Sequence, residues 1–258
     1  MASPRERLPM PAPPPISDDG PARDTPERAF FGRRKGHKLR AHQSDLIAHL
    51  LPRLSLDISA AAPPRLTTLF GPQTGRLQIQ QVRIEVGFGG GEHLIAEAAA
   101  HPQTGFIGCE PYVNGMAKIL AQIEARGLSN LRLFAGDASE LLAWAPAGSL
   151  KRIDLIHPDP WPKRRHWKRR FVQDATIAAM TRVLGDGGEF RFVCDIDHYV
   201  AWTLEHLMRS RDFTWAAERA DDWRLPWPGY TMTRYGAKAT REGRRATYLV
   251  FRKNSSGV

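Results

Sequence analysis

The sequence contains little cysteine and no long hydrophobic run, and each absence excludes a class of protein. Cys109 and Cys194 are the only cysteines among 258 residues. Two cysteines in apolar, strand-like surroundings indicate reduced core thiols, not a disulfide framework or a metal site. No apolar stretch approaches the ~18 residues that a membrane-spanning helix needs. The first residues also lack the apolar core of a secretion signal. We therefore expect a cytoplasmic protein that binds neither a membrane nor a metal ion.

Acidic residues are also few relative to basic ones. The chain has 37 lysines and arginines against 27 aspartates and glutamates, a formal net charge of +10 at pH 7. Such an excess favours an anionic partner, most simply nucleic acid. Residues 1–29 are rich in Pro, Asp and Arg and poor in large apolar residues, so we expect a disordered tail. Residues 30–258 are expected to form a single domain.

Strand-like and helix-like segments alternate from residue 82 onward. Strands are expected over residues 82–86, 105–109, 131–135, 153–156, 189–194, 213–218 and 247–252. Helices are expected over residues 46–54, 92–100, 114–126, 139–144, 169–184 and 198–209. This alternation predicts an α/β fold with a doubly wound, mostly parallel seven-stranded sheet. The last two strands have no clear helix between them, which indicates an antiparallel hairpin at one edge.

A glycine-rich segment, residues 85–92, links the first expected strand to its helix. Glycines permit a tight turn and a close approach of the backbone to a ligand. The dinucleotide spacing Gly-x-Gly-x-x-Gly is not met, because Glu92 stands where the third glycine would be. Glu85 would repel a pyrophosphate but suits S-adenosylmethionine, which carries a sulfonium and an ammonium group. A purely structural turn is the alternative.

Acidic residues follow three successive expected strands. Glu110 ends the second strand, where a carboxylate can accept hydrogen bonds from ribose hydroxyls. Asp137 ends the third strand, beside the expected position of adenine. Each residue alone is equally explained as a helix N-cap or turn acid. Together with Glu85 they predict a binding site for S-adenosylmethionine.

The most informative stretch is residues 153–170, where an apolar strand meets Pro158-Asp159-Pro160 and then a cationic run. Prolines cannot continue a strand ladder, so Asp159 is expected on a stiff turn at the carboxyl edge of the sheet, where open α/β sheets bind ligands. Six cations lie within eight positions: Lys163, Arg164, Arg165, Lys168, Arg169 and Arg170. A solvated start of a helix is the plainer interpretation. The rigid carboxylate and the flanking tryptophans favour a polyanion docked beside a reaction centre.

Together these motifs resemble the class I S-adenosylmethionine-dependent methyltransferases, and more narrowly the bacterial tRNA (guanine-N7-)-methyltransferases. The resemblance covers about residues 30–253, and it is carried by residues 85–91, 108–110, 136–138, 158–166, 194–195 and 233–235. It implies a Rossmann-like fold and methyl transfer from S-adenosyl-L-methionine to N7 of a guanosine in tRNA, at position 46 of the variable loop.

The resemblance also implies roles for individual residues. Asp159 is implied to be catalytic. The implied cofactor-binding residues are Glu85, Gly87, Gly89, Glu110, Asp137 and Asp159. The implied substrate-binding residues are Lys163, Asp195, Thr233, Arg234, Tyr235 and Gly236. The implied RNA-binding residues are Arg165, His166, Trp167, Lys168, Arg169 and Arg170. The family motif ends in Glu where this chain has Gly236, and Glu242 is the nearest acid that would compensate.

Guanine N7 is a lone-pair nucleophile, so its methylation requires alignment and charge stabilisation but no general base. A carboxylate that accepts from guanine N1–H and the 2-amino group would stabilise the product and select guanine over adenine. Asp159 and Asp195 both fit this role, and Asp195 is alternatively a helix N-cap. Lys163 suits either a phosphate or the guanine O6. Three aromatic residues form either a wall for the nucleobase or a cover over the core: Trp223, Trp227 and Tyr230.

Two other classes of function compete with this interpretation. A non-catalytic RNA-binding protein could use a methyltransferase fold as a scaffold, but a scaffold would not need four acids at strand ends. An NAD-linked oxidoreductase is disfavoured by Glu92 and by the basic run. The sequence leaves the oligomeric state open.

Overall fold

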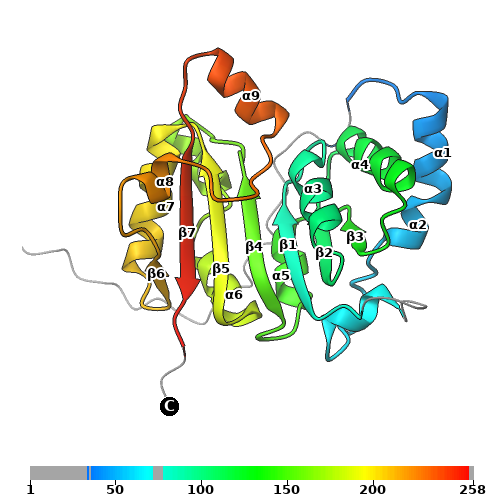
Figure 1. Cartoon of the computed structure of the whole chain (residues 1–258), viewed down its shortest axis with the longest axis horizontal. Coiled ribbons are helices and arrows are strands. Elements are labelled where there is room, and N and C mark those ends of the chain that lie inside the picture. The colour runs from blue at the N-terminus through cyan, green and yellow to red at the C-terminus, as the bar shows by residue number, and fades with distance from the viewer. Residues whose placement is uncertain (1–33, 35, 72–77, 256–258) are drawn as a thin grey trace, which may run out of the picture. The chain divides into compact units, whose positions relative to one another are not determined.

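A sheet of seven strands organises the computed structural model, which describes residues 34, 36–71 and 78–255 (Figure 1). The strand order is β3-β2-β1-β4-β5-β7-β6. The strands are β1 (Gln81–Val86), β2 (Thr104–Cys109), β3 (Leu131–Phe134), β4 (Leu150–Ile156), β5 (Leu184–Cys194), β6 (Phe213–Trp215) and β7 (Thr247–Lys253). The expected tail, residues 1–29, lies outside the described residues and stays a prediction.

Helices connect the strands and extend the domain on its N-terminal side. The α-helices are α1 (Ala41–His49), α2 (Leu51–Leu54), α3 (Glu92–Ala100), α4 (Val113–Arg126), α5 (Ala138–Trp144), α6 (Asp174–Val183), α7 (Asp197–Arg209), α8 (Asp221–Arg224) and α9 (Arg234–Arg241). Two 3-10 helices complete the described chain, η1 (Leu66–Phe70) and η2 (Arg164–Arg169). The helices α8 and α9 were not among the elements expected from the sequence.

Strands β1 to β5 are mutually parallel, which confirms the doubly wound α/β sheet. Strand β7 runs antiparallel to β5 on one side and to β6 on the other. The antiparallel edge is therefore present, but the last strand of the chain takes the inner position and the short β6 takes the edge. All parallel strands end on the same side of the sheet, and α9 lies beyond that end (Figure 1).

Two expected helices differ most from the structure, each for a local reason. The segment expected as one helix over residues 46–54 divides into α1 and α2, with Pro52 in the first turn of α2. The helix expected from Arg169 begins only at Asp174, because Gln173 and Thr176 form a capping box there. Its end comes at Val183, because Leu184 already pairs with Leu150 of β4. The cationic run therefore lies on η2 and not on the first turns of a long helix.

The core lies on both faces of the sheet. One cluster packs Ile153 and Phe190 of the central strands against residues of α5, α6 and α7, such as Met180. The other cluster packs Leu94 of α3 and Ile119 of α4 against β2 and β3. Cys109 and Cys194 are buried and unpaired, as the sequence indicates. Among the described residues, no helix is both long and apolar enough to cross a membrane.

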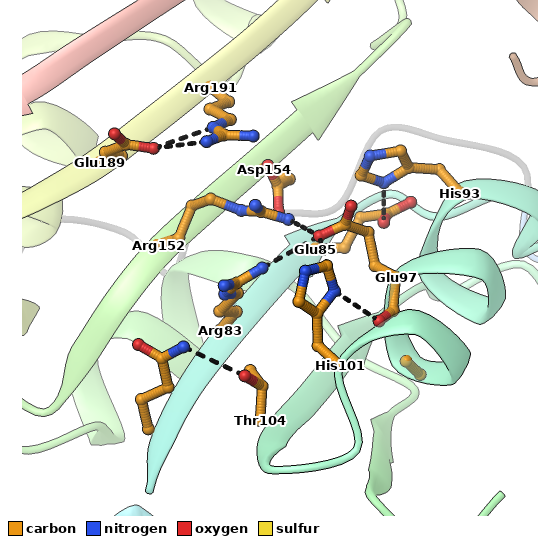
Figure 2. A network of polar contacts seen from close by, with 12 residues as sticks. Arg83, Glu85, His93, Glu97, His101, Thr104, Arg152, Asp154, Glu189 and Arg191 are labelled. Atoms are coloured by element: carbon orange, nitrogen blue, oxygen red, sulfur yellow. Dashed lines mark hydrogen bonds and ion pairs between the residues drawn. The ribbon is translucent and has the colours of Figure 1, made fainter. Parts of the chain in front are cut away.

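One face of the central strands carries charges in place of apolar side chains (Figure 2). Arg152 of β4 donates to Asp154 at 2.8 Å and to Glu97 of α3, and Arg83 of β1 bonds the same Glu97 at 3.0 Å. Arg152, Asp154 and Glu97 are all buried. Buried charges are tolerated only when they are paired and hydrogen-bonded. This ionic cluster therefore fixes α3, and with it the glycine loop before α3, to the sheet.

Candidate active site

The glycine-rich loop after β1 depends on backbone conformations that other residues rarely adopt. Gly87, Gly89 and Gly91 have φ angles of 69°, 58° and 82°, all in the left-handed region. A Cβ atom at Gly91 would lie 2.7 Å from Ile119 Cγ1, so the loop packs closely on α4. A Cβ atom at Gly87 would meet nothing within 4 Å. The loop therefore combines a rigid backbone with open space above its first glycine.

Glu110 ties the end of β2 to this loop. One of its carboxylate oxygens accepts from Gly89 N at 2.8 Å, and the other accepts from Tyr112 N at 3.0 Å. Burial raises the pKa of Glu110, although these two backbone donors partly oppose the rise. The carboxylate lies beside the glycine loop at the carboxyl edge of the sheet, as the sequence predicts.

Glu85 lies beneath the loop and is paired within the protein. Its Oε2 lies 2.7 Å from Nδ1 of His93, a histidine of α3 that is 1% exposed (Figure 2). Burial opposes a charge on His93, but the attraction of Glu85 outweighs it and raises the pKa of His93 to about 9. Sequence reasoning missed His93, although it directly follows the glycine loop.

Asp137 has the structural role that its position also predicts, that of a helix cap. Its Oδ1 accepts from the backbone N of Ser139 at 2.8 Å and from the Ser139 hydroxyl at 2.7 Å, so it is the N-cap of α5. It also follows β3 at the same edge of the sheet, and the carbonyl of the preceding Gly136 accepts from Cys109 Sγ of β2 at 3.3 Å. The capping role and the position beside the expected adenine are compatible.

The turn after β4 is held in an unusual backbone conformation. His157 and Trp161 have φ angles of 48° and 43°, and they are the only non-glycine residues with positive φ in the described part of the chain. They bracket Pro158-Asp159-Pro160. Backbone strain of this kind costs about 1–3 kcal/mol per residue and gathers at functional sites. Asp159 is exposed at the tip, yet the surrounding protein partly desolvates it and raises the pKa of its carboxyl group.

A buried arginine holds this turn from behind. Arg170 is 0% exposed; its Nε donates to Pro160 O at 3.1 Å and its Nη2 lies 2.7 Å from His198 Nδ1. Its guanidinium group lies within about 5 Å of three aromatic rings, those of Trp167, Tyr199 and Trp202. This enclosure disfavours the expected contact between Arg170 and RNA, which stays a prediction.

The remaining residues of this segment differ in their surroundings. Lys163, Arg164, Arg165 and Lys168 are exposed on and beside η2. Arg169 lies 5.0 Å from the Trp161 ring, and His166 lies edge-on to the same ring. Trp167 instead packs on the interior side, and its ring centroid is 5.4 Å from that of Trp202. Trp167 thus supports Arg170 and is poorly placed for the RNA contact expected of it.

The segment 233–236 begins α9 and lies over the glycine loop. Thr233 is the N-cap of α9, and its hydroxyl accepts from Gly236 N at 3.2 Å. A Cβ atom at Gly89 would lie 3.4 Å from Tyr235 Cε2 and 3.7 Å from Arg234 Nη2. Residues separated by more than a hundred positions are therefore neighbours at the carboxyl edge of the sheet.

Asp195 follows β5 and is not the N-cap of α7, since that position belongs to Ile196. Its Oδ1 lies 3.1 Å from His157 Nδ1, and its Oδ2 accepts from Arg244 Nε at 2.6 Å. Burial alone would raise the pKa of Asp195, but the hydrogen bonds from Arg244 and His157 lower it below its ordinary value. Asp195 is therefore a carboxylate whose orientation is fixed by these two partners. Arg244 was not anticipated from the sequence.

The sequence allows two interpretations of Trp223, Trp227 and Tyr230, and in the structure all three pack against the protein. Trp227 and Tyr230 lie 5.4 Å apart and cover Tyr248 of β7, and Trp223 packs against the main core cluster. This packing favours the interpretation that they cover an edge of the core.

Comparisons with known proteins agree with this geometry. A family model described as a putative methyltransferase matches residues 79–249. A tRNA (guanine-N(7)-)-methyltransferase of Rhodopseudomonas palustris (strain BisB18) is 73% identical over 241 residues, covering 93% of this chain and 94% of the relative. The protein of the same name from Bradyrhizobium diazoefficiens is 71% identical over 234 residues, covering 91% of this chain and 97% of the relative.

A solved structure shares the fold alone. The 16S rRNA methyltransferase KamB superposes with a TM-score of 0.53 at 17% sequence identity, covering 69% of this chain and 89% of that protein. The sheet, the glycine loop and the acids at the strand ends define a methyltransferase of the doubly wound class. The chain belongs to the tRNA (guanine-N(7)-)-methyltransferase family.

The buried position of Arg170 leads to a stability prediction. We expect Arg170→Met to lower the free energy of unfolding by about 2–4 kcal/mol, because Pro160 O and His198 lose their partner and the aromatic cluster loses its cation. Urea unfolding measures the change. The matched control is Lys168→Met at an exposed position of η2, which should change stability by less than about 0.5 kcal/mol. Equal stabilities for the two variants would contradict the assigned role of Arg170.

Proposed function

We propose that this chain transfers the methyl group of S-adenosylmethionine to N7 of a guanosine in tRNA. The observation that carries the proposal is the position of Asp159. It stands on a strained, proline-bracketed turn at the carboxyl edge of the sheet, close enough to Glu110 to help raise the pKa of that group, and the exposed cations of η2 follow it directly in the chain. The names of the close relatives support the same reaction.

The edge formed by β1, β2 and β3 suits S-adenosylmethionine. The open space above Gly87 admits the ligand against the backbone, and Glu110 offers a buried carboxylate for the ribose hydroxyls. Asp137 lies beside the expected adenine. Glu85 faces inward to His93, so we assign it a supporting position below the cofactor's cationic end. Bound S-adenosylmethionine supplies an electrophilic methyl group on a sulfonium ion.

The edge formed by β4 and β5 suits the guanine. Asp195 is held as a carboxylate and can accept from N1–H and the 2-amino group of guanine, which favours the purine as it becomes cationic. Asp159 lies between the two ligands and aligns the reacting atoms. No residue needs to remove a proton from N7. The main contribution of the protein to the rate is therefore the alignment of cofactor and guanine by the glycine loop and the turn after β4.

The exposed cations beside Asp159 suit the phosphates of tRNA. Lys163, Arg165 and Lys168 face solvent, and a backbone docked on them would present a base to the turn. The formal net charge of +10 supports the same partner. A protein that modifies tRNA in this way acts in the cytoplasm. A non-catalytic RNA-binding role is disfavoured, because the strand-end acids would then have no function.

The reaction is tested by incubating the purified chain with labelled S-adenosylmethionine and unmodified tRNA, followed by nucleoside analysis. We expect N7-methylguanosine as the labelled nucleoside. Label on another atom of guanosine, or tRNA binding without transfer, would contradict the proposal.

Asp159→Asn tests the role of the turn. We expect a loss of about 100-fold or more in single-turnover rate, because a preorganised charge is removed. The pKa of Asp159 is raised, so the wild-type rate should fall as pH drops through that raised value and Asp159 is protonated. The variant should lack this acid limb. Asp45→Asn on α1 is the matched control. A variant rate within about threefold of wild type would remove Asp159 from catalysis.

A further inference from the structure

Three elements meet at the carboxylate of Asp195. His157 approaches Oδ1 from the end of β4, with Nδ1 at 3.1 Å. Arg244 approaches Oδ2 from the loop between α9 and β7, with Nε at 2.6 Å. Both oxygens therefore have a partner from a different part of the chain, and only 11% of the Asp195 side chain is exposed. The direction in which the carboxylate can still accept a hydrogen bond is fixed by these two neighbours.

The position of Arg244 is itself fixed by a neighbouring carboxylate. Its Nη1 bonds Glu242 Oε2, and Lys238 Nζ lies 3.8 Å from Glu242 Oε1. Gly243 between them has a φ angle of 73°, so the chain turns sharply and both side chains lie on the same side. An arginine presents several donors in a rigid plane, which allows it to bridge two carboxylates. Glu242 thus acts on Asp195 through Arg244.

His157 fixes the opposite side of Asp195. Burial lowers the pKa of His157, so the ring is neutral, with its Nδ1 hydrogen directed at Asp195. Its Nε2 is buried without a hydrogen-bond partner, and a Cβ atom at Gly236 would lie 3.0 Å from it. Any side chain at position 236 would press on this ring. Glycine at the start of α9 is therefore matched to the imidazole below it.

We infer that Arg244 is a positioning residue that sets guanine selectivity, by fixing the Asp195 carboxylate toward the 2-amino group of the target purine. This inference rests on the proposed function. Glu242 does not contact the substrate itself; it holds Arg244 in place. The expectation that Glu242 replaces a missing acid at Gly236 is thereby modified, because its effect is indirect.

A substrate without the 2-amino group distinguishes this role of Arg244 from a simple phosphate contact. Inosine keeps N7 and N1–H of guanosine but lacks the 2-amino group. An enzyme with a correctly oriented Asp195 should prefer guanosine at the target position by about 10- to 100-fold in kcat/KM, the effect of one charge-assisted hydrogen bond. A residue that only binds phosphate would affect both substrates equally.

The experiment compares methylation of tRNAs that carry guanosine or inosine at the target position, for wild type, Arg244→Gln and Arg244→Lys. Arg245→Gln is the matched control, because Arg245 is an exposed neighbouring cation. We expect the guanosine preference to fall to within about threefold of unity in Arg244→Gln. Arg244→Lys should recover part of it, since lysine keeps the charge but cannot bridge both carboxylates. Arg245→Gln should keep the wild-type ratio, and the melting temperature and cofactor affinity should be unchanged in all variants.

Three other outcomes would each contradict one of the claims made above. If Arg244→Gln loses rate equally on both substrates, Arg244 is a phosphate or structural residue. If wild type does not prefer guanosine over inosine, Asp195 does not read the 2-amino group and the inference fails while the reaction stands. If wild type methylates neither tRNA, the proposed function fails, and the inference falls with it.

Discussion

The contact between Arg170 and the turn after β4 is the constraint on which the proposed reaction centre depends. Asp159 is held between two prolines and two residues in the left-handed region, a conformation that costs free energy. The buried guanidinium group offsets this cost by donating to Pro160 O and packing among three aromatic rings. Arg170, which the sequence presents as one of six equivalent charges, thus stabilises the backbone of this turn. The exposed cations around it are available for the RNA that the proposed function requires.

The same edge of the sheet gathers groups from the whole domain. The ionic cluster around Arg152 fixes α3, and therefore the glycine loop, against β1 and β4. Helix α9 then lies over that loop and places Gly236 against His157. Carboxylates lie at the ends of β1, β2 and β3, where we propose that the cofactor binds, and after β4 and β5, where we propose that the guanine binds. In this proposal the two ligands meet at Asp159.

Much of this arrangement could be predicted from the sequence, because strand–helix alternation and prolines are local signals. The seven-stranded sheet, the strand-end positions of Glu110 and Asp137, and the turn at Asp159 all followed from them. The missed features depend on contacts between distant parts of the chain. Arg244 lies 49 positions from Asp195, and no periodicity connects the two. The burial of Arg170 depends on aromatic side chains of α7, so the charge run alone indicated the wrong environment for it.

The central claim is that one carboxyl edge holds the cofactor and presents its reactive end to Asp159. The most direct test is a crystal structure of the protein with S-adenosylhomocysteine. The account predicts the ribose hydroxyls on Glu110, the adenine beside Asp137 and the sulfur facing Asp159. A nucleoside bound elsewhere, for example in the pocket lined by Arg191, Trp227 and Arg252, would contradict it.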